Sequence, residues 1–196
     1  MCADDDWIIS SLLEDLGALA LARDRVSVHD LVETIGPRGF GPLLALLAGM
    51  LILPTGMIPG VPNVVALFLI LIGGRMMTGA QEIWVPDRLG RVSFSGHMLA
   101  VSVAKAQRWA LWLRPHLMPR LVFLVEGAVA RRAIALILLL TGAVMTLVGL
   151  IPGFPFVLSL HVVVLGLALS SRDGLAALVG YALILAEILF ITAFFL

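Results

Sequence analysis

Two long apolar runs without a charged side chain dominate the pattern of this chain, at residues 40–74 and 133–171. They are 35 and 39 residues long. At 1.5 Å of rise per residue, a single helix of either length would overshoot the roughly 30 Å hydrocarbon core of a bilayer. We therefore expect each run to fold back as a helical hairpin, 40–57 with 61–75 and 133–150 with 156–171.

Clusters of proline and glycine at 54–63 and 149–155 mark the turns of both hairpins. Proline removes a backbone donor and glycine accepts positive φ, so neither cluster continues a helix. Two placements stay open. Arms of about 17 residues let the turns lie outside the membrane; alternatively, the turns lie at bilayer depth, where helix N-termini favour an anion or an oxygen-rich solute. The candidate solute-site residues here are Pro59, Gly60, Pro62, Asn63, Pro152, Gly153 and Pro155.

The second half of the chain repeats the pattern of the first at a shift of 93 positions. Matches fall where the backbone favours Gly or Pro, or where a charge precedes an apolar run. The pattern predicts two units that share one supersecondary plan, as in many transporters. The aligned pairs include Glu33 with Glu126, Arg38 with Arg131, Gly49 with Gly142, Gly60 with Gly153, Pro62 with Pro155 and Gly73 with Gly166.

We accordingly divide the chain at residue 92. Residues 1–92 form the first repeat, with an amphipathic helix, a short helix that begins near Ser27 and Asp30, the hairpin 40–75 and a connecting loop. The second repeat covers 93–196, with an interfacial helix at 97–114, the hairpin 133–171 and a final membrane helix at 174–196. The predicted fold is thus an all-α integral membrane protein of duplicated helical hairpins, broken at Pro-Gly turns, with amphipathic interfacial helices.

The helix at 97–114 carries Lys105 and Arg108 opposite a narrow apolar stripe. Two charges near the bilayer centre would cost roughly 5–7 kcal/mol, so we place this helix along the interface. If 93–113 crosses the membrane instead, the two repeats become inverted, and the sequence leaves this alternative open.

Composition supports a lipid environment. Of 196 residues, 61% are hydrophobic and only 13% are charged, against about 25% charged in soluble domains. The mean hydropathy of +1.09 argues against a soluble enzyme, a disordered scaffold and a nucleic-acid-binding protein.

A net charge of zero hides a segregation of charge. Residues 1–39 hold eight acidic and three basic side chains, whereas residues 75–132 hold nine basic and three acidic ones. The positive-inside rule then places the basic segment in the cytoplasm and both Pro-Gly turns toward the other face. We expect about five membrane segments in the bacterial inner membrane, with the N-terminus inside. The basic residues that we place on the cytoplasmic side are Arg38, Arg75, Arg131, Arg132 and Arg172.

Glu187 and His161 are the polar residues that lie deepest in the apolar segments. A charged carboxylate at that depth costs several kcal/mol unless it is protonated, paired or facing a polar cavity. The two residues are therefore a candidate proton or cation site, with His161 as the partner of Glu187. A neutral interhelical hydrogen bond is the alternative.

Ion pairs and helix packing supply the remaining candidates. Two pairs of opposite charges precede the hairpins, Glu33 with Arg38 and Glu126 with Arg131. Either they anchor each hairpin to its preceding helix, or they are solvated interface charges. No catalytic or metal-binding signature and no cofactor motif is present, so we do not expect an enzyme. Small residues such as Gly49 and Gly142 permit close packing and a homodimer.

The order of motifs along the whole chain resembles the ExoD family of bacterial exopolysaccharide-synthesis membrane proteins. The residues that carry the resemblance run from 27–36 through Pro54–Pro62, Gly79, Trp84–Pro86, Glu126, Arg131–Arg132 and Ile151–Pro155 to Arg172–Gly174. Arg75 and Val85 depart from the family's usual residues. The resemblance implies a cytoplasmic-membrane protein of exopolysaccharide production, and it carries over no catalytic residue.

Two hypotheses follow. In the first, the chain supports exopolysaccharide synthesis or export by moving a proton, an ion or a small solute. In the second, it is a membrane scaffold or regulator whose basic segment 75–132 recruits polysaccharide-synthesis proteins or anionic lipid.

Overall fold

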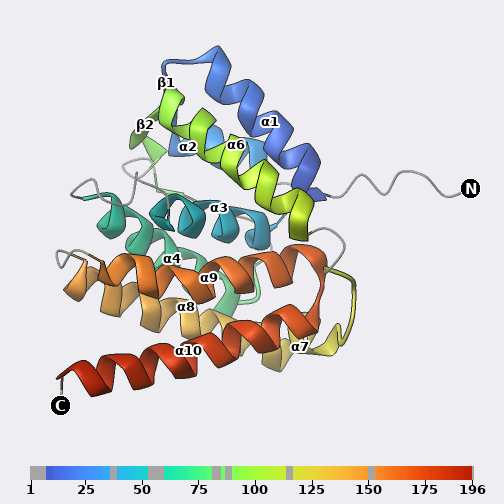
Figure 1. The fold of residues 1–196 in the computed structure, drawn as a ribbon, viewed down its shortest axis with the longest axis vertical. Helices are drawn as coiled ribbons and strands as arrows, with labels where there is room; N and C mark the ends of the chain where they lie inside the picture. Colours follow the sequence, from blue (N-terminus) through green and yellow to red (C-terminus); the bar gives the residue numbers. More distant parts are fainter. Residues whose placement is uncertain are drawn as a thin grey trace, which may run out of the picture.

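The computed structural model describes residues 8–35, 39–52, 60–80, 85–86, 90–113, 117–149 and 153–195. Within these ranges the chain is largely helical, with one short ribbon of two antiparallel strands (Figure 1). The elements in chain order are α1 (Ile8–Ala22), β1 (Arg25–Ser27), α2 (Val28–Ile35), α3 (Phe40–Ile52), α4 (Val61–Met77), β2 (Ser93–Ser95), α6 (Gly96–Leu113), α7 (Phe123–Glu126), α8 (Ala128–Val148), α9 (Phe154–Ser171) and α10 (Gly174–Phe195).

The predicted helical arms are present as α3, α4, α8 and α9, and the all-helical class is confirmed. Part of each turn cluster, including Pro59 and Pro152, lies outside the described residues. The described residues of the two turns share the same backbone conformation. Gly60 and Gly153 adopt φ of 96° and 94°, and each accepts a backbone hydrogen bond, from Val64 N–H and Val157 N–H. Proline follows as the second helical residue in both cases, where no helical bond needs its N–H.

These four helices do not pack as the two self-contained hairpins that the sequence predicts. The main partner of α3 is α9, and the main partner of α4 is α8. Glycines bring the backbones together. A Cβ atom added to Gly142 of α8 would lie 2.7 Å from the Ala66 carbonyl oxygen of α4, and one on Gly166 of α9 would lie 2.6 Å from the Ala45 nitrogen of α3. Each arm therefore packs mainly on an arm of the other pair, because backbone contact gains more dispersion energy than a side-chain contact across a wider gap.

The contacts also fix which ends of the helices lie together. Gly41 at the start of α3 approaches Ser170 at the end of α9, and Asn63 at the start of α4 approaches Gly149 at the end of α8. One end of the bundle consequently holds Gly60 and Gly153, and the other holds basic side chains. The basic side chains at that second end are Arg75, Arg131, Arg132 and Arg172.

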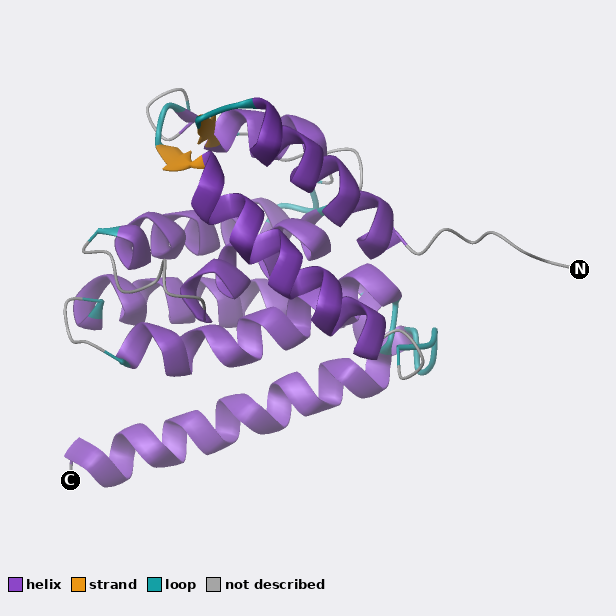
Figure 2. Cartoon of the chain, turned by 45° about the horizontal axis from the view of Figure 1, so that its top comes forward, coloured by secondary structure: helices purple, strands orange, loops and turns teal. Residues whose placement is uncertain are grey.

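Helices α1 and α6 pack on each other and lie across one side of the bundle, whereas α10 runs along the opposite side (Figures 1 and 2). The β1–β2 ribbon joins α1 to α6, with Val26 paired to Phe94. The predicted apolar stripe of α6 is buried, as Leu99 and Val103 show. Short strands were not expected from the sequence, because three residues are too few to display a period of two.

Two of the described helices are long and apolar enough to cross a membrane by length and composition alone. They are Ala128–Leu147, with mean hydropathy 1.9, and Phe154–Ser171, with mean hydropathy 2.0. Phe40–Ile52, Val61–Met77 and Gly174–Leu189 are apolar but shorter by this measure.

Candidate functional site

His161 and Glu187 come into direct contact between α9 and α10. Nδ1 of His161 lies 2.6 Å from Oε2 of Glu187. The helices run antiparallel, and a Cβ atom on Gly180 would lie 2.7 Å from Leu165 Cδ2. This close approach holds the two backbones near enough for the short contact between the side chains.

The pair is buried among apolar side chains. His161 is 2% exposed and Glu187 is 7% exposed. A desolvated carboxylate or imidazolium is costly unless it is paired and hydrogen-bonded, so each group depends on the other. Oε1 of Glu187 is buried and has no hydrogen-bond partner in the part of the chain that the structure describes. The carboxyl group therefore has one hydrogen-bonded oxygen and one oxygen without a partner among the described residues.

Thr141 on α8 is the third member of the site. Its Oγ1 lies 2.9 Å from Nε2 of His161, and the side chain is buried. The three groups thus form a continuous polar line from α8 through α9 to α10. Since these helices run side by side (Figure 1), the line crosses the bundle rather than following its axis.

Thr141 was missed by the sequence analysis. It lies in an apolar run that also contains Thr146, which donates its hydroxyl to the Gly142 carbonyl oxygen of its own helix. Apolar residues surround both threonines on every side of the helix, so no period reveals which of them faces the core. A search for polar residues within the uncharged runs would have found both.

The turn residues lie apart from the pair. His161 follows Gly153 by eight residues, which is about 12 Å along a helix. Pro62 and Pro155 are buried, whereas Gly60, Gly153 and Asn63 are exposed. The turns and the pair are therefore two separate sites.

The predicted interface charges have other partners than expected. Glu126 of α7 pairs with Arg172 at the end of α9, with Oε1 2.9 Å from Nε, rather than with Arg131. This arrangement arises because α7 packs beside the ends of α9 and α10. On the exposed face of α2, Oε1 of Glu33 lies 3.2 Å from Nε2 of His29. The expected partner of Glu33, Arg38, lies outside the described residues. Lys105 and Arg108 are exposed on α6, as predicted from its pattern.

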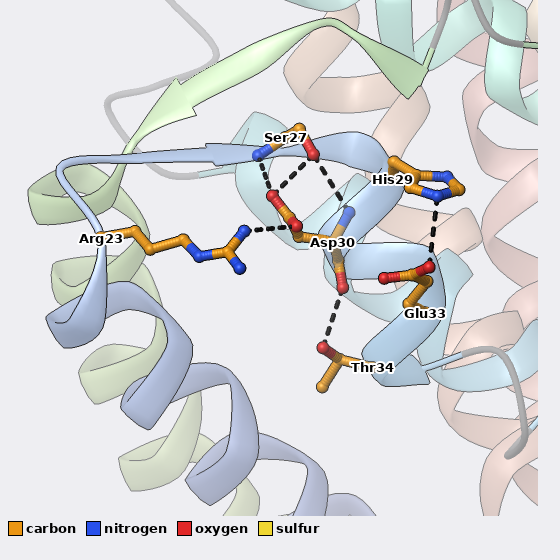
Figure 3. Close-up of polar contacts among 6 residues, drawn as sticks. All are labelled: Arg23, Ser27, His29, Asp30, Glu33 and Thr34. Atoms are coloured by element: carbon orange, nitrogen blue, oxygen red, sulfur yellow. Dashed lines mark hydrogen bonds and ion pairs between the residues drawn. The ribbon is translucent and has the colours of Figure 1, made fainter.

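A separate polar cluster caps α2 (Figure 3). The Ser27 hydroxyl and backbone N–H both donate to Oδ2 of Asp30, at 2.6 and 2.9 Å, and the Asp30 N–H donates to the Ser27 hydroxyl at 3.1 Å. Arg23 lies 2.6 Å from the other carboxylate oxygen. The hydrogen bonds from Ser27, with the adjacent Arg23, hold the pKa of Asp30 below its ordinary value of 3.8. The cluster confirms the predicted helix start and has the geometry of a capping box.

Comparison with known proteins identifies the chain by its whole length rather than by one site. The family model described as "Exopolysaccharide synthesis, ExoD" matches residues 9–193. The curated "Protein ExoD" of Rhizobium meliloti (strain 1021) is 30% identical over 172 residues, which cover 87% of this chain and 71% of that relative. No solved structure matches. This agreement in sequence over nearly all of its length shows that the chain belongs to the ExoD family of exopolysaccharide synthesis.

Proposed function

We propose that this chain is a multi-pass inner-membrane protein that supports exopolysaccharide synthesis or export by moving protons, ions or a small solute. It does so without enzymatic chemistry, and the His161–Glu187 pair is its protonation site. The observation that carries the proposal is the 2.6 Å contact between two ionisable side chains buried in apolar helices. Such groups are costly in lipid and are typical of proton relays and solute pathways.

The apolar surface of the bundle supports the membrane part of this proposal. Large aliphatic side chains are exposed along α8 and α10, on helices whose other faces are packed. Soluble proteins rarely expose contiguous apolar patches of this kind, whereas lipid chains cover them without cost. The exposed aliphatic residues of these two helices are Val129, Leu136, Leu140, Val144, Leu147, Leu175, Leu178, Val179, Leu185, Ile188 and Leu189.

Proton uptake by proteoliposomes tests the proposal. The purified protein is reconstituted with a pH-sensitive dye inside the vesicles, and uptake is recorded after an external acid pulse. We expect uptake by the natural protein and a loss of at least tenfold in Glu187→Gln, since an amide cannot exchange a proton. Glu126→Gln is the matched control, because Glu126 is exposed and paired at the bundle end. Unchanged uptake in Glu187→Gln, or no flux of protons or ions in the natural protein, removes the carrier function.

A second function rests on the exposed face of α6. Lys105 and Arg108 share that face with Leu111 and with Trp112, which is 70% exposed. Basic and aromatic side chains on one face are typical of helices that lie on anionic membranes. In this case the chain is a scaffold that recruits anionic lipid or polysaccharide-synthesis proteins.

A variant with a neutralised basic segment distinguishes the scaffold function from the carrier function. The variant changes Lys105, Arg108, Arg114 and Arg120 to Gln, of which Arg114 lies outside the described residues. Loss of binding to vesicles that contain anionic lipid, or of co-purifying synthesis proteins, with proton uptake unchanged favours the scaffold. Unchanged binding excludes it.

A further inference from the structure

The hydroxyl group of Thr141 faces the one nitrogen of His161 that Glu187 does not contact. Its Oγ1 lies 2.9 Å from Nε2, and Thr141 is 7% exposed. We propose that Thr141 is a positioning residue of the protonation site, which holds the imidazole with Nδ1 toward Glu187 and partners Nε2 in both of its protonation states. This inference rests on the proposed function and assigns a role within the same site.

A hydroxyl group suits this role because it both donates and accepts a hydrogen bond. When Nε2 carries a proton, its N–H donates to Oγ1. When that proton leaves, the threonine O–H donates to the free nitrogen. Thr141 can therefore satisfy the ring before and after proton transfer by rotating one O–H bond. A buried nitrogen without either partner would bear the cost of an unsatisfied polar group.

The line from Thr141 through His161 to Glu187 allows one proton transfer. In the starting state Glu187 is ionised and the neutral His161 ring carries its proton on Nδ1. A hydronium ion gives a proton to Nε2 and leaves as water, the Nδ1–H bond breaks, and the proton from Nδ1 bonds to Oε2 across the 2.6 Å contact. The ring ends neutral with its proton on Nε2 and donating to Thr141. The carboxyl group ends neutral, and the charge of the site changes from −1 to 0.

No other ionisable group competes for His161 in the described helices packed against α9. The described residues of α3 include none. On α8, Arg131 and Arg132 lie nine or more positions before Thr141, and on α10 Tyr181 lies six positions before Glu187. The remaining ionisable groups, on α1 and α7, are exposed. The buried Ser159 of α9 donates its hydroxyl to the Phe156 carbonyl oxygen of its own helix.

The test compares Thr141→Val, which keeps the shape and removes the hydroxyl, with Thr141→Ser, which keeps the hydroxyl. Thr146→Val is the matched control, since Thr146 lies on the same helix and bonds only its own backbone in the described contacts. The full-length protein is labelled with ¹⁵N-histidine and reconstituted in lipid bilayers. The ring-nitrogen signals of His161, assigned by their absence in His161→Gln, are followed against pH.

We expect the Nε2 signal of His161 to move in Thr141→Val at every pH, because that nitrogen loses its hydrogen-bond partner in both protonation states. Thr141→Ser and Thr146→Val should keep the natural Nε2 signal. Proton uptake should fall in Thr141→Val, because the ring is no longer held with Nδ1 toward Glu187. An unchanged Nε2 signal in Thr141→Val overturns the inference. If that variant does not fold, Thr141→Ala is measured in its place with the same two outcomes.

The nuclear magnetic resonance signal separates this inference from the proposed function. If the natural protein transports nothing but the Nε2 signal of His161 moves in Thr141→Val, the carrier function fails and the role of Thr141 stands. If uptake depends on Glu187 but the Nε2 signal of His161 is the same in all three threonine variants, the carrier function stands and the role of Thr141 fails.

Discussion

At the scale of single residues, the most constrained positions are the ionisable groups withdrawn from water. Glu187 and His161 were recognisable in the sequence because ionisable side chains are expensive in an apolar helix. We expected the two side chains to meet only because both lie deep in apolar segments. In the structure, Nδ1 of His161 lies 2.6 Å from Oε2 of Glu187. Thr141 could not be selected in the same way, since a threonine hydroxyl is cheap to bury once it bonds its own helix.

Asp30 is the residue whose charge should couple stability to pH. Because its pKa is lowered, the folded state favours the ionised carboxylate more than the unfolded chain does. The stabilisation is therefore present above the unfolded pKa near 3.8 and is lost as the pH falls through the lower folded pKa. We expect Asp30→Ala to lower the free energy of unfolding by about 1 kcal/mol at neutral pH, as for a lost helix cap.

Thermal unfolding in detergent at a series of pH values measures this effect. Asp30→Asn is the control, because it keeps a capping oxygen but cannot titrate, so its stability should lack the acid-dependent component of the natural protein. Equal stability of Asp30→Ala and the natural protein at neutral pH would contradict a structural role for the Ser27–Asp30 cap.

At the scale of elements, glycines decide which helices touch. Gly49 and Gly142 occupy equivalent positions under the shift of 93, yet their surroundings differ. A Cβ atom on Gly142 would lie 2.7 Å from the Ala66 carbonyl oxygen, whereas one on Gly49 would meet nothing within 4 Å. The sequence predicts both as packing positions, and only the arrangement of helices shows that one of them is in contact.

Alanine at these two positions should therefore have opposite effects. Gly142→Ala forces α4 and α8 apart, and we expect a loss of about 1–3 kcal/mol, typical of overpacking. Gly49→Ala should be neutral or stabilising by about 0.4–1 kcal/mol, because alanine restricts the unfolded chain and suits a helix. Chemical unfolding followed by circular dichroism measures both. Similar losses in the two variants would show that α3 has a close neighbour at Gly49 that the structure does not contain.

At the scale of the whole molecule, the two ends of the bundle differ in chemistry. One end carries the caps at Gly60 and Gly153, and the other carries Arg75, Arg131, Arg132 and Arg172. This polarity agrees with the orientation that we expect from the positive-inside rule, with the basic end in the cytoplasm. The position of the bilayer around the bundle is part of our proposal.

Cysteine labelling in sealed membrane vesicles tests that position. In a Cys2→Ser background we expect an impermeant thiol reagent to label Asn63→Cys only from outside and Arg120→Cys only from the cytoplasmic side. Leu140→Cys is the decisive variant. Leu140 is 58% exposed in the protein, so water reaches it unless lipid covers it. Labelling of Leu140→Cys from either side, or extraction of the protein without detergent, would contradict membrane insertion.

The sequence by itself determined the family, the helical class and the bounds of the main helices to within a few residues. It could do so because charge-free runs, proline, glycine and caps act through the local backbone and the cost of desolvation. Only the tertiary structure decided that α3 packs on α9 and α4 on α8, that Glu126 meets Arg172, and that Thr141 joins the buried pair. The Glu126–Arg172 pair depends on where α7 packs. The helix pairings and the contact of Thr141 depend on which face of a uniformly apolar helix turns inward, and a helix with no polar face carries no such information in its own sequence.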